Sequence, residues 1–154
     1  MYLTIVILLM AALPLGSIGF EHYFVHSPPP LWLLMGKWFV FWSAGVRLVL
    51  AGLKQFLQPR FTAEDIFGIA NDEVLPLVRE LGVANFATGV VGVASLVRPS
   101  FVLPVAISAG IFYGVAGIRH LAATHRTGNE DIAMWSDLFV FLIFAVFVGF
   151  AAIA

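Results

Sequence analysis

The feature that most constrains this chain is a series of five apolar stretches, each long enough to cross a lipid bilayer as a helix. A spanning helix needs about 20 mostly apolar residues, and its backbone N–H and C=O groups satisfy one another within the helix. The chain is 61% hydrophobic and only 11% charged, whereas soluble domains carry about 25% charged residues. A soluble fold of 154 residues would leave too much of this apolar surface in water. We therefore predict an integral membrane protein.

The fold class follows from where these stretches begin and end. Pro28–Pro30 closes the first stretch, because proline cannot continue a helix. Residues 58–71 are expected to form an interfacial loop that contains a short helix. The prediction is a single integral membrane domain, residues 1–154, of the all-α transmembrane class: a four-helix bundle plus an additional N-terminal transmembrane helix. The five expected spans cover approximately residues 2–24, 31–57, 72–97, 101–123 and 132–153.

The first stretch has some features of a secretory signal peptide. It combines an apolar core with the small residues Gly16, Ser17 and Gly19. Signal peptides carry a positively charged region ahead of the apolar core, and no such region precedes it here. We therefore expect residues 2–24 to form the first membrane helix.

Lysine and arginine residues near the helix ends predict the orientation, because cytoplasmic loops carry an excess of both. With five spans, the N-terminus, the loop at 58–71 and the loop after residue 123 share one side. The opposite side carries only Lys37 and Arg98. We therefore predict a multi-pass protein with a cytoplasmic N-terminus and an external C-terminus. The cytoplasmic side, called the basic end below, carries Lys54, Arg60, Arg79, Arg119 and Arg126.

Several ionisable or polar side chains fall inside the expected spans. A charged group there costs about 2.5–3.5 kcal/mol to insert, so each one is a candidate for function. At about 1.5 Å of rise per residue, the charged members all lie in the half of the bilayer nearest the basic end. Four helices could present them to one polar cavity. The predicted cavity residues are Arg47, Glu80, Asn85, Tyr113, His120 and Asp137.

Most of these residues also have a purely structural interpretation. Glu80, beside Arg79 near the interface, would simply be hydrated. An ion pair between Arg47 and either Glu80 or Asp137 would fix the register of two helices. Asn85 would form an interhelical hydrogen bond. His120, near a helix end, would interact with the helix dipole or a lipid headgroup.

Glycines indicate where helices pack closely. Gly82, Gly89 and Gly92 share one quadrant of the third span with Asn85. Gly110 and Gly114 form a small-xxx-small pair in the fourth span. Such residues let a neighbouring backbone approach, so we interpret them as packing positions.

Several chemistries are excluded or only weakly indicated. Without cysteine the chain has no disulfide, thiolate metal site, iron–sulfur cluster or cysteine nucleophile. It shows no hydrolase or phosphate-binding motif, and a net charge of −1 without a basic stripe argues against nucleic acid as a partner. Glu80, His120 and Asp137 would suit iron or zinc. No spaced ligand pair supports such a site, so we assign no metal.

Three stretches between Phe61 and Phe150 carry the most specific patterns. They are RELGVANFATGVVGV (Arg79–Val93), FYGVAGIRHL (Phe112–Leu121) and HRTGNEDIAMWSDLFV (His125–Val140). They resemble a family of small bacterial membrane proteins of unknown function, in the DoxX-like group of four-helix membrane bundles. This resemblance implies that the protein lies in the bacterial inner (plasma) membrane. More distantly, the bundle is similar to the sterol-binding EXPERA proteins, which have acidic residues in a ligand pocket. The resemblance assigns the family's polar positions to Glu80, Asn85, Tyr113, His120 and Asp137, and it does not extend to residues 1–58.

Together these features predict a membrane-embedded binding protein for a lipid, quinone or other amphipathic ligand, or an accessory subunit of a membrane complex. Its partners would be the lipid bilayer, that ligand, and further copies of the chain or other subunits. One alternative is a proton-coupled transporter or channel, in which glutamate, histidine and aspartate relay protons. A second alternative is a membrane-embedded, metal-assisted enzyme. The sequence favours a non-enzymatic role and identifies no cofactor.

Overall fold

The computed structural model describes residues 2–124 and 126–154, and every regular element in these ranges is helical. Met1 and His125, which opens the third of the resembling stretches, lie outside the described residues. Five helical segments are long and apolar enough to cross a membrane. This confirms the all-helical class and the presence of five such helices. Their bounds are Tyr2–Phe24, Leu31–Leu57, Asp72–Ala94, Pro99–Ala122 and Gly128–Ile153.

Most of these segments consist of more than one type of helix. The first contains α1 (Tyr2–Ile7), η1 (Leu8–Ala12) and α2 (Leu13–Phe24), and the second α3 (Leu31–Phe39), η2 (Val40–Val46) and α4 (Arg47–Leu57). η1 and η2 are π-helical, as is the short η3 (Phe61–Ile66) in the connection that follows α4. The 3₁₀ turns η4 (Asp72–Val74) and η5 (Pro99–Phe101) precede α5 (Leu75–Ala94) and α6 (Val102–Ala122), and the last helix is α7 (Gly128–Ile153).

Two boundaries differ from the expected spans by three or more residues, for local reasons. The third helix ends at Ala94 rather than residue 97, where the Ser95 hydroxyl donates to the Gly92 carbonyl across 2.6 Å. The fifth helix begins at Gly128 rather than residue 132 because Thr127 caps it. The Thr127 hydroxyl accepts the backbone N–H of Glu130 across 3.0 Å, which satisfies a donor that the first helical turn leaves free.

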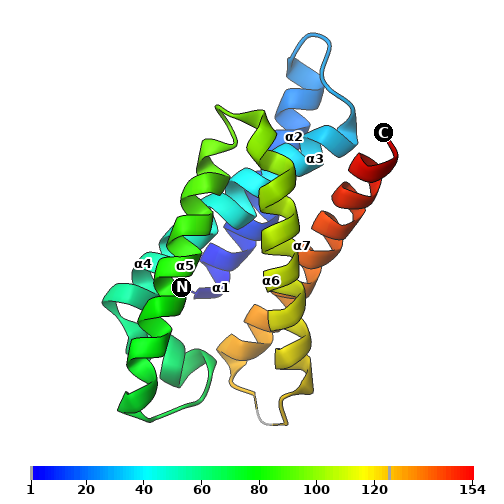
Figure 1. The fold of residues 1–154 in the computed structure, drawn as a ribbon. Helices are drawn as coiled ribbons and strands as arrows, with labels where there is room; N and C mark the ends of the chain where they lie inside the picture. The colour runs from blue at the N-terminus through cyan, green and yellow to red at the C-terminus, as the bar shows by residue number, and fades with distance from the viewer. Residues whose placement is uncertain (1, 125) are drawn as a thin grey trace.

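The five segments run antiparallel in turn (Figure 1). The α4–α5 and α6–α7 connections lie at the basic end, and the α2–α3 and α5–α6 connections lie at the opposite end, together with the C-terminus. The first segment is displaced along the bundle, so that its last turn extends past its neighbours at that opposite end (Figure 1). Near its start, the Tyr2 ring contacts Phe61 of η3 edge-on, with 6.0 Å between the ring centroids.

The main apolar core is formed by the first, second, fourth and fifth segments. Its buried members include Met10, Phe39, Val105 and Phe144. Among the described residues, α5 contributes none to this cluster. The additional helix is therefore α5, and the expected arrangement, in which the N-terminal helix stands outside a four-helix bundle, is corrected. α5 lacks large side chains on its packed face, which is why it does not enter the core.

Glycine determines how α5 attaches to the rest of the protein. A Cβ atom on Gly45 would lie 2.8 Å from the backbone of Gly92, and one on Gly52 would lie 2.5 Å from the carbonyl oxygen of Gly82. A Cβ atom on Gly89 would lie 2.5 Å from a backbone nitrogen of α4. Because backbone atoms cannot move aside as a flexible side chain can, these positions require glycine at this helix spacing. The packing role predicted for Gly82, Gly89 and Gly92 is confirmed.

The interface of α6 and α7 uses glycine differently. Here large side chains of α7 fill the space that glycines leave on α6. A Cβ atom on Gly114 would lie 2.8 Å from the Phe141 ring, and one on Gly117 would lie 2.8 Å from the Leu138 side chain. The two helices therefore interlock through side chains, whereas α4 and α5 meet backbone to backbone.

Candidate functional site

A cluster of polar side chains lies inside the four-segment core. We call Ser43, Arg47, Tyr113 and Asp137 the central cluster. Arg47, at the start of α4, donates from Nη2 to Oδ1 of Asp137 on α7 across 3.3 Å. Its guanidinium also lies over the Tyr113 ring of α6, 5.2 Å from the ring centroid. The two charged side chains are 14% and 7% exposed, so the ion pair is mostly removed from the surroundings and links the second segment to the fifth.

The π-helical segments supply the remaining contacts of this cluster. A π-helix pairs each N–H with the fifth carbonyl before it and leaves backbone groups of the surrounding α-helix without their usual partner. The Ser43 hydroxyl of η2 donates to the carbonyl of Leu9 in η1 across 3.1 Å. The Tyr113 hydroxyl donates to the Ser43 carbonyl across 2.5 Å. Three segments are thus joined through carbonyl groups in widened turns.

A second polar contact lies one helical repeat closer to the basic end. His120 of α6 and Glu130 of α7 are both buried, and Nδ1 of His120 lies 2.8 Å from a carboxylate oxygen of Glu130. On α6, His120 follows Tyr113 by seven residues, and on α7, Asp137 follows Glu130 by seven. Residues seven apart share a helix face. The His120–Glu130 contact therefore lies on the same faces of α6 and α7 as Tyr113 and Asp137 of the central cluster, one helical repeat away.

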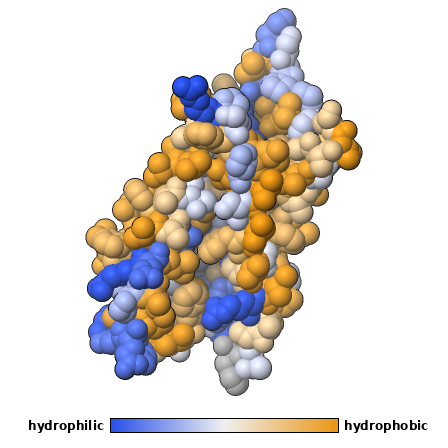
Figure 2. Space-filling model, viewed as in Figure 1, coloured by the Kyte–Doolittle hydropathy of each residue, from blue (hydrophilic) through white to orange (hydrophobic). Residues whose placement is uncertain are grey.

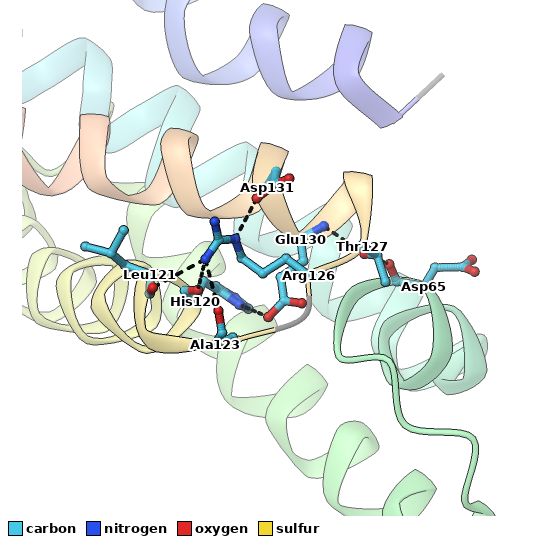
Figure 3. A network of polar contacts seen from close by, with 8 residues as sticks. All are labelled: Asp65, His120, Leu121, Ala123, Arg126, Thr127, Glu130 and Asp131. Atoms are coloured by element: carbon cyan, nitrogen blue, oxygen red, sulfur yellow. Dashed lines mark hydrogen bonds and ion pairs between the residues drawn. The ribbon is translucent and has the colours of Figure 1, made fainter.

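Arg126 and Thr127 of the α6–α7 connection lie beside the His120–Glu130 contact, as Figure 3 shows. Arg126 donates from Nη1 to the Ala123 carbonyl across 3.1 Å, and from Nε to Asp131 across 2.7 Å. The Thr127 hydroxyl donates to the carbonyl of Asp65 in η3 across 2.6 Å. The guanidinium thus caps free carbonyls at the C-terminus of α6, a position that favours positive charge. These contacts tie η3 to the helix ends beside His120.

The structure brings together four of the six predicted cavity residues. Arg47, Tyr113 and Asp137 belong to the central cluster. His120 lies one helical repeat away, in its contact with Glu130. Asn85 is buried, but it donates from Nδ2 to Oε1 of Gln55 on α4 across 2.8 Å. Its place in the polar cavity is corrected to an α4–α5 hydrogen bond.

Glu80 is the second correction. It lies exposed on α5 and forms no hydrogen bond or ion pair with a described residue. α5 turns its glycine face toward α4, and Glu80 lies outside that face. The carboxylate beside His120 is instead that of Glu130. The choice between two partners for Arg47 is also resolved, because Arg47 pairs with Asp137.

Three residues near the site were missing from the sequence prediction. Ser43 precedes Arg47 by four residues in an apolar span, which places both on one helix face. Glu130 follows Thr127 in a Thr-x-x-Glu pattern typical of a helix start, so helix α7 could have been extended to include it. Tyr2, which lies beside the Arg47 guanidinium, gave no signal in the sequence.

Glu80, His120 and Asp137, the three residues considered above as possible metal ligands, do not gather at one point. Within residues 2–124 and 126–154, no three histidine, aspartate or glutamate side chains gather in a way that could hold a metal ion. One open pocket lies beside Gly16 and Trp38, and another lies beside Arg60 and Arg79. Neither is lined by the central cluster.

Comparison with known proteins identifies a family but no characterised relative. The model of a family described as "Family of unknown function (DUF6790)" matches residues 1–154. The chain matches no curated protein and no solved structure. The DoxX-like resemblance therefore stays a prediction.

Proposed function

The chain belongs to the DUF6790 family, whose function is unknown, and we propose that it is a membrane-embedded binding protein for a neutral, carbonyl-bearing amphipathic ligand of the quinone class. The ligand's polar head would lie against Arg47 and Tyr113, with its apolar part among the helices. The basic end would face the cytoplasm of a bacterial inner membrane. The observation that carries the proposal is the surplus of hydrogen-bond donors on Arg47.

A guanidinium has five N–H donors. One of those of Arg47 reaches Asp137, at 3.3 Å, and the hydroxyls of Tyr2 and Tyr113 lie beside it. Donors remain beyond these three partners, and 14% of the side chain stays exposed. Among the described residues, the buried side-chain nitrogen and oxygen atoms without a hydrogen-bond partner include none of Arg47, so its remaining donors are accessible to a ligand. A ligand oxygen would accept hydrogen bonds from them.

The charge balance indicates which kind of oxygen would bind. Asp137 already neutralises Arg47. An anionic headgroup would compete with Asp137 and leave that carboxylate unpaired, at a cost of several kcal/mol. A quinone carbonyl accepts hydrogen bonds without adding charge, so it fits the existing ion pair. The alternative of a carboxylate ligand, such as a fatty acid, is therefore disfavoured.

The helix arrangement indicates a route into the bilayer core. α5 and α6 diverge from the turn that joins them (Figure 1), and the surface is hollowed between α5 and α6 on the same side of the molecule (Figure 2). A ligand dissolved in the membrane could enter between these helices without crossing an aqueous phase. α5 is also the helix that stands outside the main core.

The proton-relay alternative receives less support. His120 and Asp137 lie toward the basic end. Seven residues further from that end, on the same helix faces as Tyr113 and Asp137, lie Ala106 of α6 and Phe144 of α7. Both are fully buried in the apolar core. A relay would stop at Tyr113, about halfway along the helices, since apolar side chains carry no protons.

The test is a binding titration on the purified protein in detergent with decylubiquinone. We expect saturable binding by isothermal calorimetry, and an affinity at least about tenfold lower for Arg47→Gln, as expected on losing a charge-assisted hydrogen bond. Arg119→Gln is the matched control, because it makes the same substitution at an arginine of α6 that lies over the Phe67 ring and not in the central cluster. Decanoate should bind more weakly than the quinone. Absence of quinone binding, equal binding by the Arg47 variant, or tighter binding of decanoate would reject the proposal.

A further inference from the structure

A second site of a different character lies at the basic end. A pocket of about 560 Å³ opens between the end of α4, η3 and the start of α5. Its wall combines apolar side chains with charged ones, as expected where a protein meets lipid headgroups. The residues that matter for its chemistry are Leu57, Leu75, Arg60, Glu64, Asp65 and Arg79.

Part of the charge in this pocket is already paired within the protein. Arg60 donates to Asp72 across 2.8 Å and to Glu64 across 3.3 Å. The carboxylate of Asp72 raises the pKa of the Arg60 guanidinium above its usual value, so Arg60 remains charged and paired. Arg60 and Glu64 therefore leave little net charge for a ligand.

The other two charged residues are free to meet a ligand. Arg79 is exposed and forms no ion pair or hydrogen bond with the part of the chain that the structure describes. Asp65 uses its backbone carbonyl to accept from Thr127, while its carboxylate points away from the α6–α7 network (Figure 3). The pocket thus offers one positive group on α5 and one negative group on η3.

We propose that this pocket binds the headgroup of phosphatidylethanolamine, with the lipid phosphate on Arg79 and the ammonium on Asp65. Arginine matches the geometry of phosphate oxygens, and an ammonium donates N–H bonds to a carboxylate. The acyl chains continue along Leu57, which is 70% exposed at the end of α4. The site is separate from the central cluster and does not depend on quinone binding.

The charge pattern distinguishes this lipid from its neighbours in a membrane. Phosphatidylglycerol would satisfy Arg79 but bring no cation to Asp65. Phosphatidylcholine carries a quaternary ammonium, which has no N–H to donate. Phosphatidylethanolamine alone among these three supplies both a phosphate and a hydrogen-bonding ammonium.

Native mass spectrometry of the full chain tests the assignment. The purified protein would be mixed with equal amounts of phosphatidylethanolamine, phosphatidylcholine and phosphatidylglycerol carrying identical acyl chains. We expect retention of the ethanolamine lipid to exceed that of the other two by about threefold, the size typical of a partly exposed charge pair. Arg79→Gln should lower retention of all three lipids, and Asp65→Asn should abolish the preference. Arg119→Gln and Asp131→Asn, which change charges outside the pocket, should leave the preference intact.

The other outcomes overturn the proposal. Equal retention of the three lipids, or a preference for phosphatidylglycerol, would show that Asp65 does not select an ammonium. A preference that survives Asp65→Asn would do the same, and Asp65→Asn alters only an exposed carboxylate, so folding is not at risk. Displacement of the lipid by an equal concentration of glycerophosphoethanolamine or inorganic phosphate would identify a site for a soluble phosphate compound instead.

Discussion

The helix α5 and the four-segment core are held in place by opposite means. α5 meets α4 and η2 through backbone contacts at glycines, with one partly buried side-chain hydrogen bond among the described residues, from Asn85 to Gln55. The segments of the core are joined by an ion pair, carbonyl hydrogen bonds and stacked aromatic rings. The difference teaches that dispersion contacts suffice to attach a helix in lipid, whereas polar groups fix which helices meet at one point. The contrast yields four predictions.

The largest effect is expected from breaking the ion pair in the core. Arg47→Ala leaves Asp137 buried without its partner, which should lower the free energy of unfolding by about 3–5 kcal/mol. Unfolding in mixed micelles, followed by circular dichroism, measures the change. Replacing both residues, as Arg47→Met with Asp137→Leu, should restore most of the stability. A double variant as unstable as Arg47→Ala would show that something other than the unpaired charge is responsible.

The next largest effect is expected from separating α5. Gly52→Val places atoms against the backbone of Gly82 and should cost about 3 kcal/mol. Because α5 lies outside the core, it should detach locally. With no native cysteine in the chain, Val78→Cys provides a probe on the buried face of α5, and its maleimide labelling should accelerate. Gly16→Val, where a Cβ meets nothing within 4 Å, is the control. Unchanged labelling would mean that glycine does not hold α5.

A smaller effect is expected at the widened turn of the second segment. Tyr113→Phe removes the hydroxyl that donates to the Ser43 carbonyl and leaves that acceptor unpaired. Stability should fall by about 1–2 kcal/mol, measured by the same unfolding transition. Tyr23→Phe, which alters an exposed tyrosine, should have no effect. Equal stability of both variants would indicate that the carbonyl finds another donor.

The smallest effect is expected for the polar contact of α5. The coupling between Asn85 and Gln55 should be about 0.6 kcal/mol, the average for interhelical hydrogen bonds in a membrane protein. A double-mutant cycle with Asn85→Ala and Gln55→Ala measures it. A coupling several times larger would remove the contrast between α5 and the core, since α5 would then also depend on polar groups.

Some site residues were predictable because depth in the membrane can be counted along the chain. Arg47, His120 and Asp137 were placed in one half of the bilayer in this way, and the structure brings them near one another. Depth placed Glu80 there as well, but Glu80 lies outside the cluster because depth does not reveal which way a helix face turns. Glycine spacing on α5 marked the face that packs, and Glu80 lies outside it. The glycine pattern alone therefore argued against placing Glu80 in the polar cavity.

The five spans were determined by the sequence itself, since transfer of a side chain from water to lipid depends mainly on that side chain. The partners inside the bundle were decided only by the tertiary structure. η1 and η2 each add a residue to a turn, which rotates every later side chain relative to a regular 3.6-residue helix. A projection of Arg47 along an ideal helix therefore cannot identify Asp137 as its partner. Partner choice depends on the packing of four segments at once, and no single stretch of sequence contains that information.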